Sequence, residues 1–294
     1  MEPLISVILP VYKENVRWIE KSVSSILSQS FSSFELIIVL DDPDNIDAER
    51  FIREVSSKDS RVRSYKNNKN RGLIYNLNFM SKVSRGKYIA RMDADDIAMP
   101  DRLEKQLKYL VEHRLDIVGS QMIVVDSEDK PVRMLAKTKP LVNSSDPSIL
   151  FRTPAYHPTW LAKRDVILTL GYRNVYCAED YDLLLRSLLK GYQVGNSQEC
   201  LLYYRVNTGS ISNEKSYDQM LMKERVISLF KKGRLIDEVP SCRPNVVCRK
   251  FHGVAHSLFI IFSKGRLKYA PLVIPIILLS SLYRRHFFRA ILNR

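Results

Sequence analysis

The first half of the chain alternates short apolar runs with segments of helical periodicity. Residues 4–10 (LISVILP) and 34–40 (FELIIVL) are almost entirely apolar, which is typical of strands covered on both faces. In residues 19–27 and 48–55 the apolar side chains recur at intervals of three and four, which predicts helices with one buried face. The chain is therefore predicted to begin with a strand, a helix, a second strand and a second helix.

The same alternation continues along the chain. A strand at residues 62–66, a helix at 73–83, a strand at 88–92 and a helix at 101–114 are predicted next. Because strand–helix–strand units make right-handed crossovers, this order predicts an α/β fold with a mostly parallel, Rossmann-like sheet flanked by helices. Ligands of such sheets bind at the carboxyl ends of the strands, so the residues after each apolar run are the first candidates for chemistry.

Beyond residue 116 the pattern is looser. It predicts strands at 117–125 and 132–134 around a turn, a helix at 180–190, a strand at 201–206 and a helix at 217–232. We therefore expect one domain over residues 1–215, divided into halves at 1–116 and 117–215, followed by a helical C-terminal region over 216–294.

Acidic side chains follow three of the predicted strands. They are Glu14, with Tyr12, after the first strand, Asp41 and Asp42 after the second, and Asp93, Asp95 and Asp96 after the strand at 88–92. Carboxylates gathered at one edge of a sheet repel each other, and a divalent cation among them removes that cost. Hard oxygen ligands suit Mg²⁺ or Mn²⁺. The alternative is a solvated acidic turn.

Composition and missing motifs exclude several classes of protein. With 45% hydrophobic and 27% charged residues, the chain is globular and not disordered. It contains neither G-x-G-x-x-G nor a Walker loop, which excludes a standard dinucleotide-dependent dehydrogenase and a P-loop NTPase. It also lacks H-E-x-x-H and G-x-S-x-G, which excludes a zincin and an α/β-hydrolase. Four sparse cysteines, and a start without the basic residues and small-residue cleavage site of a signal peptide, indicate the cytoplasm.

Eight blocks along residues 4–213 resemble, in order, the family 2 glycosyltransferases of GT-A fold. They are ISVILPVYKEN, SVSSILSQSFSSFELIIVLDDPDN, NRGLIYNLN, KYIARMDADDIAMPDRLEKQL, AYHPTWLAKRDV, GYR, AEDYDLLLR and YRVNTGSIS. The resemblance implies an inverting enzyme that moves a sugar from a nucleotide-sugar, with a UDP-sugar favoured, to an acceptor hydroxyl. Residues 1–116 would bind the donor with Mg²⁺ or Mn²⁺, and residues 117–215 would bind the acceptor.

The resemblance also assigns roles to single residues. Asp42 matches the carboxylate that binds the imide of the base, Asp95 the contact to the ribose and sugar-nucleotide, and Asp180 the general base. Asp96, together with Asp95, matches the metal ligands. The remaining donor contacts implied are Pro10, Val11, Tyr12, Glu14, Gly72 and Asp93.

Three further residues are weaker candidates for contact with acceptor or phosphate: His157, Glu179 and Arg205. For His157 the alternative is a structural histidine with its hydrogen bonds satisfied. For Arg205 the alternative is an ion pair at the end of a strand. Arg71, beside Gly72, is a weaker candidate for a phosphate ligand, and we interpret it as a solvated charge in a loop.

Two departures from the family pattern bear on specificity. Pro43 and Asp44 stand where many relatives have Gly-Ser after the paired aspartates, which leaves the preference for the base open. The QxxRW block of processive members is absent, which favours the addition of a single sugar to each acceptor.

The positive charge is concentrated at the C-terminus. Of the formal net charge of +14, residues 231–294 carry +11, from 13 Lys or Arg and two acids. Between the charges lie uncharged runs at 251–263 and 269–283, which are shorter than the ~30 Å hydrocarbon core requires of a helix. We expect this segment to bind an anionic membrane surface, and not nucleic acid, with a packed helical hairpin or an oligomer interface as alternatives.

The expected enzyme is thus a peripheral protein of the inner face of the cell membrane. Its acceptor would be a glycan or a lipid-linked oligosaccharide in cell-surface polysaccharide synthesis. Two other functions stay open on the sequence: a nucleotidyltransferase that makes a sugar nucleotide, and a non-enzymatic basic module that binds lipid or nucleic acid.

Overall fold

The computed structural model describes residues 2–135, 137–150, 153–206 and 216–241, together with 271, 274 and 275. The chain divides into two compact units, one formed by Met1–Asn174 and Glu179–Ser210, the other by Val175–Ala178 and Ile211–Arg294. The boundary expected at residue 215 stays a prediction, because residues 207–215 lie outside the described part.

The strands and helices follow the predicted alternation. The strands are β1 (Ile5–Val11), β2 (Phe34–Leu40), β3 (Val62–Lys66), β4 (Tyr88–Arg91), β5 (Ile97–Ala98), β6 (Ile117–Val125), β7 (Pro131–Met134), β8 (Leu141–Val142), β9 (Leu161–Lys163) and β10 (Val194–Arg205). The α-helices are α1 (Val16–Leu27), α2 (Ile46–Lys58), α3 (Leu73–Val83), α4 (Arg102–Glu112), α5 (Arg164–Leu170), α6 (Glu179–Leu189) and α8 (Ser216–Lys231), with 3₁₀ turns η1 (Pro147–Leu150) and η2 (His157–Thr159).

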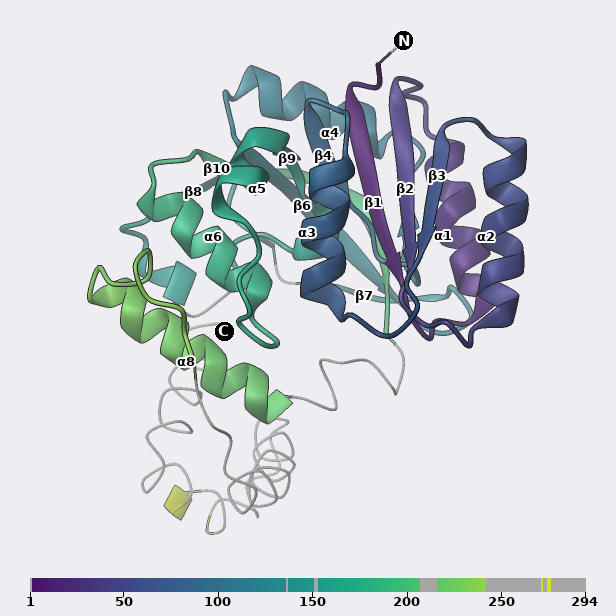
Figure 1. Cartoon of the computed structure of the whole chain (residues 1–294). Coiled ribbons are helices and arrows are strands. Elements are labelled where there is room, and N and C mark those ends of the chain that lie inside the picture. The colour runs from purple at the N-terminus through teal and green to yellow at the C-terminus, as the bar shows by residue number, and fades with distance from the viewer. Residues whose placement is uncertain are drawn as a thin grey trace. The chain divides into compact units, whose positions relative to one another are not determined.

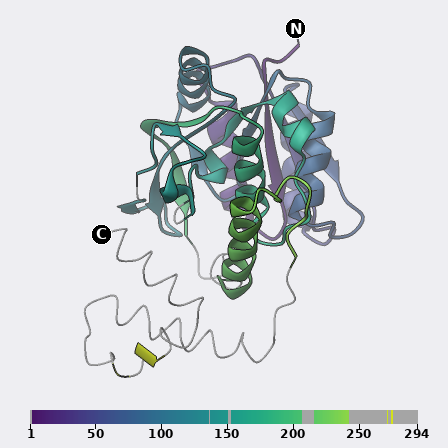
Figure 2. The same ribbon diagram turned by 90° about the vertical axis from the view of Figure 1, so that its left-hand side faces the viewer.

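One sheet runs through the first unit, in the order β3-β2-β1-β4-β9-β6-β10-β5, with β7 on β6 and β8 on β10. Strands β1 to β4 are mutually parallel, as predicted, and β6 pairs in parallel with β10. Strand β9 runs antiparallel between β4 and β6, so the second half of the sheet is mixed. Helices α3, α5 and α6 lie on one face and α1 and α4 on the other (Figures 1 and 2).

The core explains the apolar runs. Every residue of β2 is buried, and so is every residue of β1 except Pro10, because helices cover both faces of these strands. Since β1, β2 and β4 are parallel, their carboxyl ends share one edge, which we call the carboxyl edge; it is the lower edge in Figure 1.

The sequence analysis did not predict some of the short elements. Strand β9 and helix α5 are too short for a periodic pattern to be recognised. Strand β10 begins at Val194, before the predicted start at 201, because irregular pairing between Asn196 and Leu202 breaks its alternation.

Within the described residues, no helix combines the length and apolar character needed to cross a membrane. Most of the predicted membrane-binding segment, residues 231–294, lies outside them.

Candidate active site at the carboxyl edge

The loop after β1 carries the first two candidates. The Tyr12 side chain is 37% exposed, and its backbone N–H donates to Glu14 Oε2 at 2.6 Å. Of the preceding candidates, Pro10 is half-buried, whereas Val11 is in the core and its carbonyl accepts from the Asp41 N–H at 2.7 Å. The exposed ring of Tyr12 is therefore the part of this segment that faces solvent.

Asp41 and Asp42, although adjacent, have different surroundings. The buried Asp41 accepts from Asn67 Nδ2 at 2.7 Å, from the Arg71 N–H at 2.7 Å and from the Gly72 N–H at 2.8 Å. It therefore holds the loop before α3, where Gly72 has a φ of +83° that favours glycine. Asp42 is only half-buried, and its Oδ1 accepts from the Asp44 N–H at 3.1 Å.

Four carboxylates gather between the ends of β1 and β4: Glu14, Asp93, Asp95 and Asp96. Burial raises the pKa of Asp95 to about 7, with further contributions from the charges of Asp93 and Glu14. Burial also raises the pKa of Glu14 and, far more, that of Asp96. The carboxylates of this cluster therefore lack enough positive charge nearby to balance them. A divalent cation bound among them would reduce their mutual repulsion.

Asp96 lies deeper in the protein than the other three carboxylates of the cluster. Its side chain is fully buried, and its Oδ1 accepts from the Arg205 N–H at 2.9 Å. Its Oδ2 is also buried and has no hydrogen-bond partner within the part of the chain that the structure describes. Asp93 and Asp95, in contrast, are both half-buried.

Arg205 is fully engaged in structural contacts. Its Nε donates to the Asp95 carbonyl at 2.8 Å and its Nη1 to the Asp126 carbonyl at 2.9 Å, while Nη2 pairs with Asp129. Its guanidinium also lies 5.1 Å from the centre of the Trp18 ring. The side chain is buried, and these contacts match the alternative of an ion pair at the end of a strand.

His157 also takes its structural alternative. It is buried, its Nε2 and the Tyr172 hydroxyl share a hydrogen bond of 2.9 Å, and its ring contacts Trp160. Burial, aided by the nearby charge of Arg91, keeps the pKa of His157 well below its usual range, so the ring is neutral.

The acceptor-side acids stand at the first two positions of α6. Asp180 is half-buried, and its Oδ1 accepts from the Tyr181 N–H at 2.7 Å. Burial, with the charge of Asp180, raises the pKa of Glu179 to about 7, and the charge of Asp93 adds to the shift. The start of α6 therefore lies within electrostatic range of the acidic cluster, although some 85 residues separate them in sequence.

Arg91 is the site residue that the sequence analysis missed. It ends β4, is buried, and pairs through Nη2 with Asp93 Oδ1 at 2.5 Å. Its positive charge partly offsets the raised pKa values of Glu14 and Glu179. A charged residue closing the otherwise apolar strand YIAR is the signal by which it is recognisable in the sequence.

The residues at this edge fit a divalent cation in chemistry. Asp93 and Asp95 supply hard oxygen donors, and burial raises the pKa of Asp95 and of the neighbouring Asp96. Within the described residues, however, no group of three or more His, Cys, Asp or Glu side chains is already arranged to hold a metal ion.

Comparison with known proteins decides the family. The model of the family described as "Glycosyl transferase family 2" matches residues 6–167. The chain belongs to glycosyl transferase family 2. An uncharacterized glycosyltransferase of Methanocaldococcus jannaschii is 32% identical over 231 residues, which cover 78% of each chain. The Escherichia coli O-antigen biosynthesis glycosyltransferase WbnJ is 34% identical over 210 residues, covering 70% of this chain and 81% of that protein.

Solved structures agree on the fold. The structure of Staphylococcus aureus TarS 1–349 in complex with UDP-GlcNAc superposes with a TM-score of 0.62 at 20% identity. The match covers 78% of this chain and 65%, just under two thirds, of that one. The protein is therefore a glycosyltransferase with the GT-A-type α/β fold that the sequence predicted.

Proposed function

We propose that this glycosyltransferase moves one sugar, with inversion, from a UDP-sugar to a hydroxyl of a glycan or lipid-linked acceptor in cell-surface polysaccharide synthesis. The observation that carries the proposal is the meeting of the acidic cluster with the start of α6, where Asp180 stands next to Glu179 and the charge of Asp93 adds to the raised pKa of Glu179. This arrangement suits a donor diphosphate on one side and an acceptor base on the other. The O-antigen role of the Escherichia coli relative supports the acceptor class.

Donor binding is assigned to the carboxyl edge. Tyr12 would pack on the base, Asp42 would accept from its imide, and Gly72 would let the loop held by Asp41 approach the nucleotide. Asp95 and Asp93 would hold Mg²⁺ or Mn²⁺, which when bound neutralises the diphosphate leaving group. The burial of Asp96 is the reason to place it behind the metal ligands, in contrast to the sequence expectation.

Asp180 would take the proton of the acceptor hydroxyl. It is half-buried at the first turn of α6, and its Oδ1 accepts from the Tyr181 N–H at 2.7 Å. Glu179 beside it holds its proton up to about pH 7 and would act as a hydrogen-bond donor to substrate.

The Asp180→Asn variant tests the base. We expect transfer to fall by about 10³-fold, since general-base assistance and placement of the hydroxyl are both lost. Affinity for the UDP-sugar, measured by calorimetry, should stay within about twofold. Asp47→Asn, an exposed change on α2, is the matched control. Near-wild-type turnover of Asp180→Asn would remove this residue from the mechanism.

A thermal-shift panel of sugar nucleotides with and without Mn²⁺ tests the donor. We expect a UDP-sugar to raise Tm only when Mn²⁺ is present, and Asp95→Asn to abolish that rise. A product assay run in parallel should detect nucleoside diphosphate. Release of pyrophosphate in its place would show a nucleotidyltransferase.

The C-terminal region would hold the enzyme at the cytoplasmic face of the membrane. This part of the proposal rests on the 13 Lys or Arg of residues 231–294 and the apolar runs between them.

A further inference from the structure

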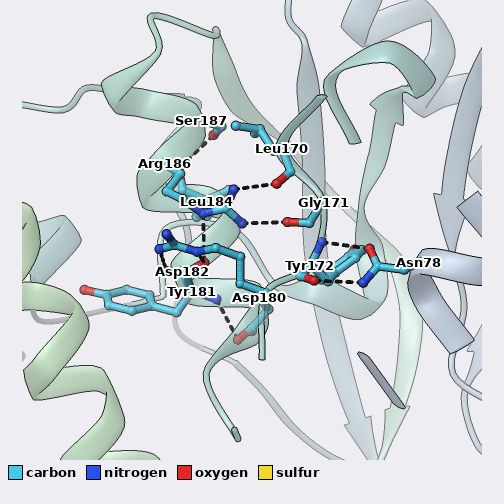
Figure 3. Close-up of polar contacts among 11 residues, drawn as sticks. Asn78, Leu170, Gly171, Tyr172, Asp180, Tyr181, Asp182, Leu184, Arg186 and Ser187 are labelled. Carbon is cyan, nitrogen blue, oxygen red and sulfur yellow. Dashed lines mark hydrogen bonds and ion pairs between the residues drawn. The ribbon is translucent and has the colours of Figure 1, made fainter. Parts of the chain in front are cut away.

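Helix α6 is tied to the end of α5 by one side chain. Arg186, which is buried, donates from Nη1 to the Leu170 carbonyl at 2.7 Å and from Nη2 to the Gly171 carbonyl at 2.6 Å (Figure 3). The last carbonyls of a helix lack partners and carry partial negative charge, so a guanidinium there satisfies both needs. Gly171, with a φ of +60°, ends α5 at this point.

Asp182 holds that guanidinium in place. It is fully buried one turn before Arg186, and its Oδ2 accepts from Arg186 Nε at 2.8 Å. The same carboxylate accepts from Arg173 through Nε at 3.0 Å and Nη2 at 2.5 Å. A buried carboxylate bonded to two arginines has its charge fully compensated, and removal of its charge leaves both cations without that partner.

The segment 170–173 is also bound to the donor half of the fold. Asn78 of α3 pairs with the backbone of Tyr172, accepting from its N–H at 2.9 Å and donating to its carbonyl at 2.8 Å (Figure 3). The Tyr172 hydroxyl bonds His157. The start of α6 is thus connected through hydrogen bonds to α3, the helix that begins after Gly72.

We propose that Asp182 and Arg186 are positioning residues for Asp180, and that their buried ion pair fixes the first turn of α6 relative to the donor site. The inference rests on the proposed function in that it takes Asp180 as the base. Asp182 follows Asp180 by two residues, within the same turn. The first turn of a helix lacks half of its backbone hydrogen bonds and frays most easily, so a side-chain anchor there sets the position of the base.

The test compares Asp182→Asn with Asp180→Asn in the full chain. The substrates are UDP-glucose, UDP-galactose and UDP-GlcNAc, each with Mn²⁺. The measured reaction is hydrolysis of the donor, in which Asp180 would activate a water molecule in place of the acceptor hydroxyl and UDP is released. For Asp182→Asn we expect kcat to fall at least about tenfold with the donor KM within about twofold, because small misplacements of a catalytic group are costly. Hydrogen exchange of the Leu183 and Leu184 amides, which bond the carbonyls of the first turn of α6, should rise.

Two further variants separate positioning from general destabilisation. Arg186→Lys keeps the charge and should retain more of kcat than Asp182→Asn does. Glu35→Gln removes another buried carboxylate with an arginine partner, Arg63, at the opposite edge of the sheet. It should lower Tm and leave both kcat and exchange in α6 unchanged.

The outcomes are distinguishable. Unchanged kcat and unchanged exchange in Asp182→Asn, with Asp180→Asn inactive, would overturn the positioning role alone. Full UDP release by Asp180→Asn would overturn the base assignment in the proposed function.

Discussion

Neighbouring acids in this protein differ in role because their surroundings differ. Asp41 accepts three hydrogen bonds and fixes a loop, while Asp42 remains half-buried. Glu179 has a pKa raised to about 7 by burial and by Asp180, whose own Oδ1 bonds the helix backbone. Residue type therefore marks the candidates, and the local environment assigns their chemistry.

The raised pKa of Glu179 predicts a pH dependence of stability. The unfolded chain releases this proton near 4.5, whereas the folded protein keeps it until about 7. The folded state therefore binds more protons in this window, and stability falls as pH rises through it. Compared with Glu179→Gln, the wild type should lose on the order of 1 kcal/mol more between pH 5 and pH 8.

Urea unfolding at several pH values measures this difference. Glu20→Gln, an exposed change on α1, is the control and should follow the wild type. Parallel curves for wild type and Glu179→Gln would contradict the raised pKa.

Among the elements, the end of β10 holds the loop after β4 that carries Asp95 and Asp96. Arg205 bonds the Asp95 carbonyl through its side chain and Asp96 through its backbone, and it also holds the turn before β7. One buried arginine thus connects β10, the loop after β4 and the β6–β7 turn.

Arg205→Met should lower the free energy of unfolding by about 3 kcal/mol, because the buried ion pair and two carbonyl bonds are lost. The UDP-sugar affinity that depends on Mn²⁺ should fall with it, since the Asp95 backbone is released. Chemical denaturation and calorimetry measure the two effects. The exposed Arg71→Met, which loses only stacking on Tyr75, should change stability by no more than about 0.5 kcal/mol. Equal effects of both variants would argue against the role given to Arg205.

For the whole molecule, the surplus of positive charge lies almost entirely in one segment. Residues 1–230 are close to balanced, at +3, whereas residues 231–294 carry +11. A surplus confined to one segment is typical of attachment to an anionic surface, not of the binding of a small anionic substrate.

Vesicle sedimentation tests this division. The full chain should bind phosphatidylglycerol vesicles, release them as salt rises, and bind phosphatidylcholine weakly, because each cation near an anionic surface contributes about 1 kcal/mol. A chain ending at residue 230 should lose vesicle binding and keep nucleotide binding. Equal binding by both chains would contradict the role of the C-terminal segment.

Much of the fold was predictable because burial on both faces leaves a local pattern. The continuous apolar runs at β1 and β2 and the helical spacing at α1 and α2 appear in short windows of sequence. The predicted bounds match β2 and differ by one residue for β1, whereas α1 begins three residues before the predicted segment. The antiparallel insertion of β9 was not predicted, because strand direction depends on pairing with β4 and β6, which are distant in the chain.

The sequence by itself determined the α/β class, the family and the acids that follow the strands, since each is carried by residues close together in the chain. Only the tertiary structure decided which of those acids face solvent, that Arg91 pairs with Asp93, and that Arg205 and His157 are buried structural residues. The physical reason is that burial and charge pairing depend on contacts between residues far apart in sequence, and these contacts set the pKa and the role of each side chain.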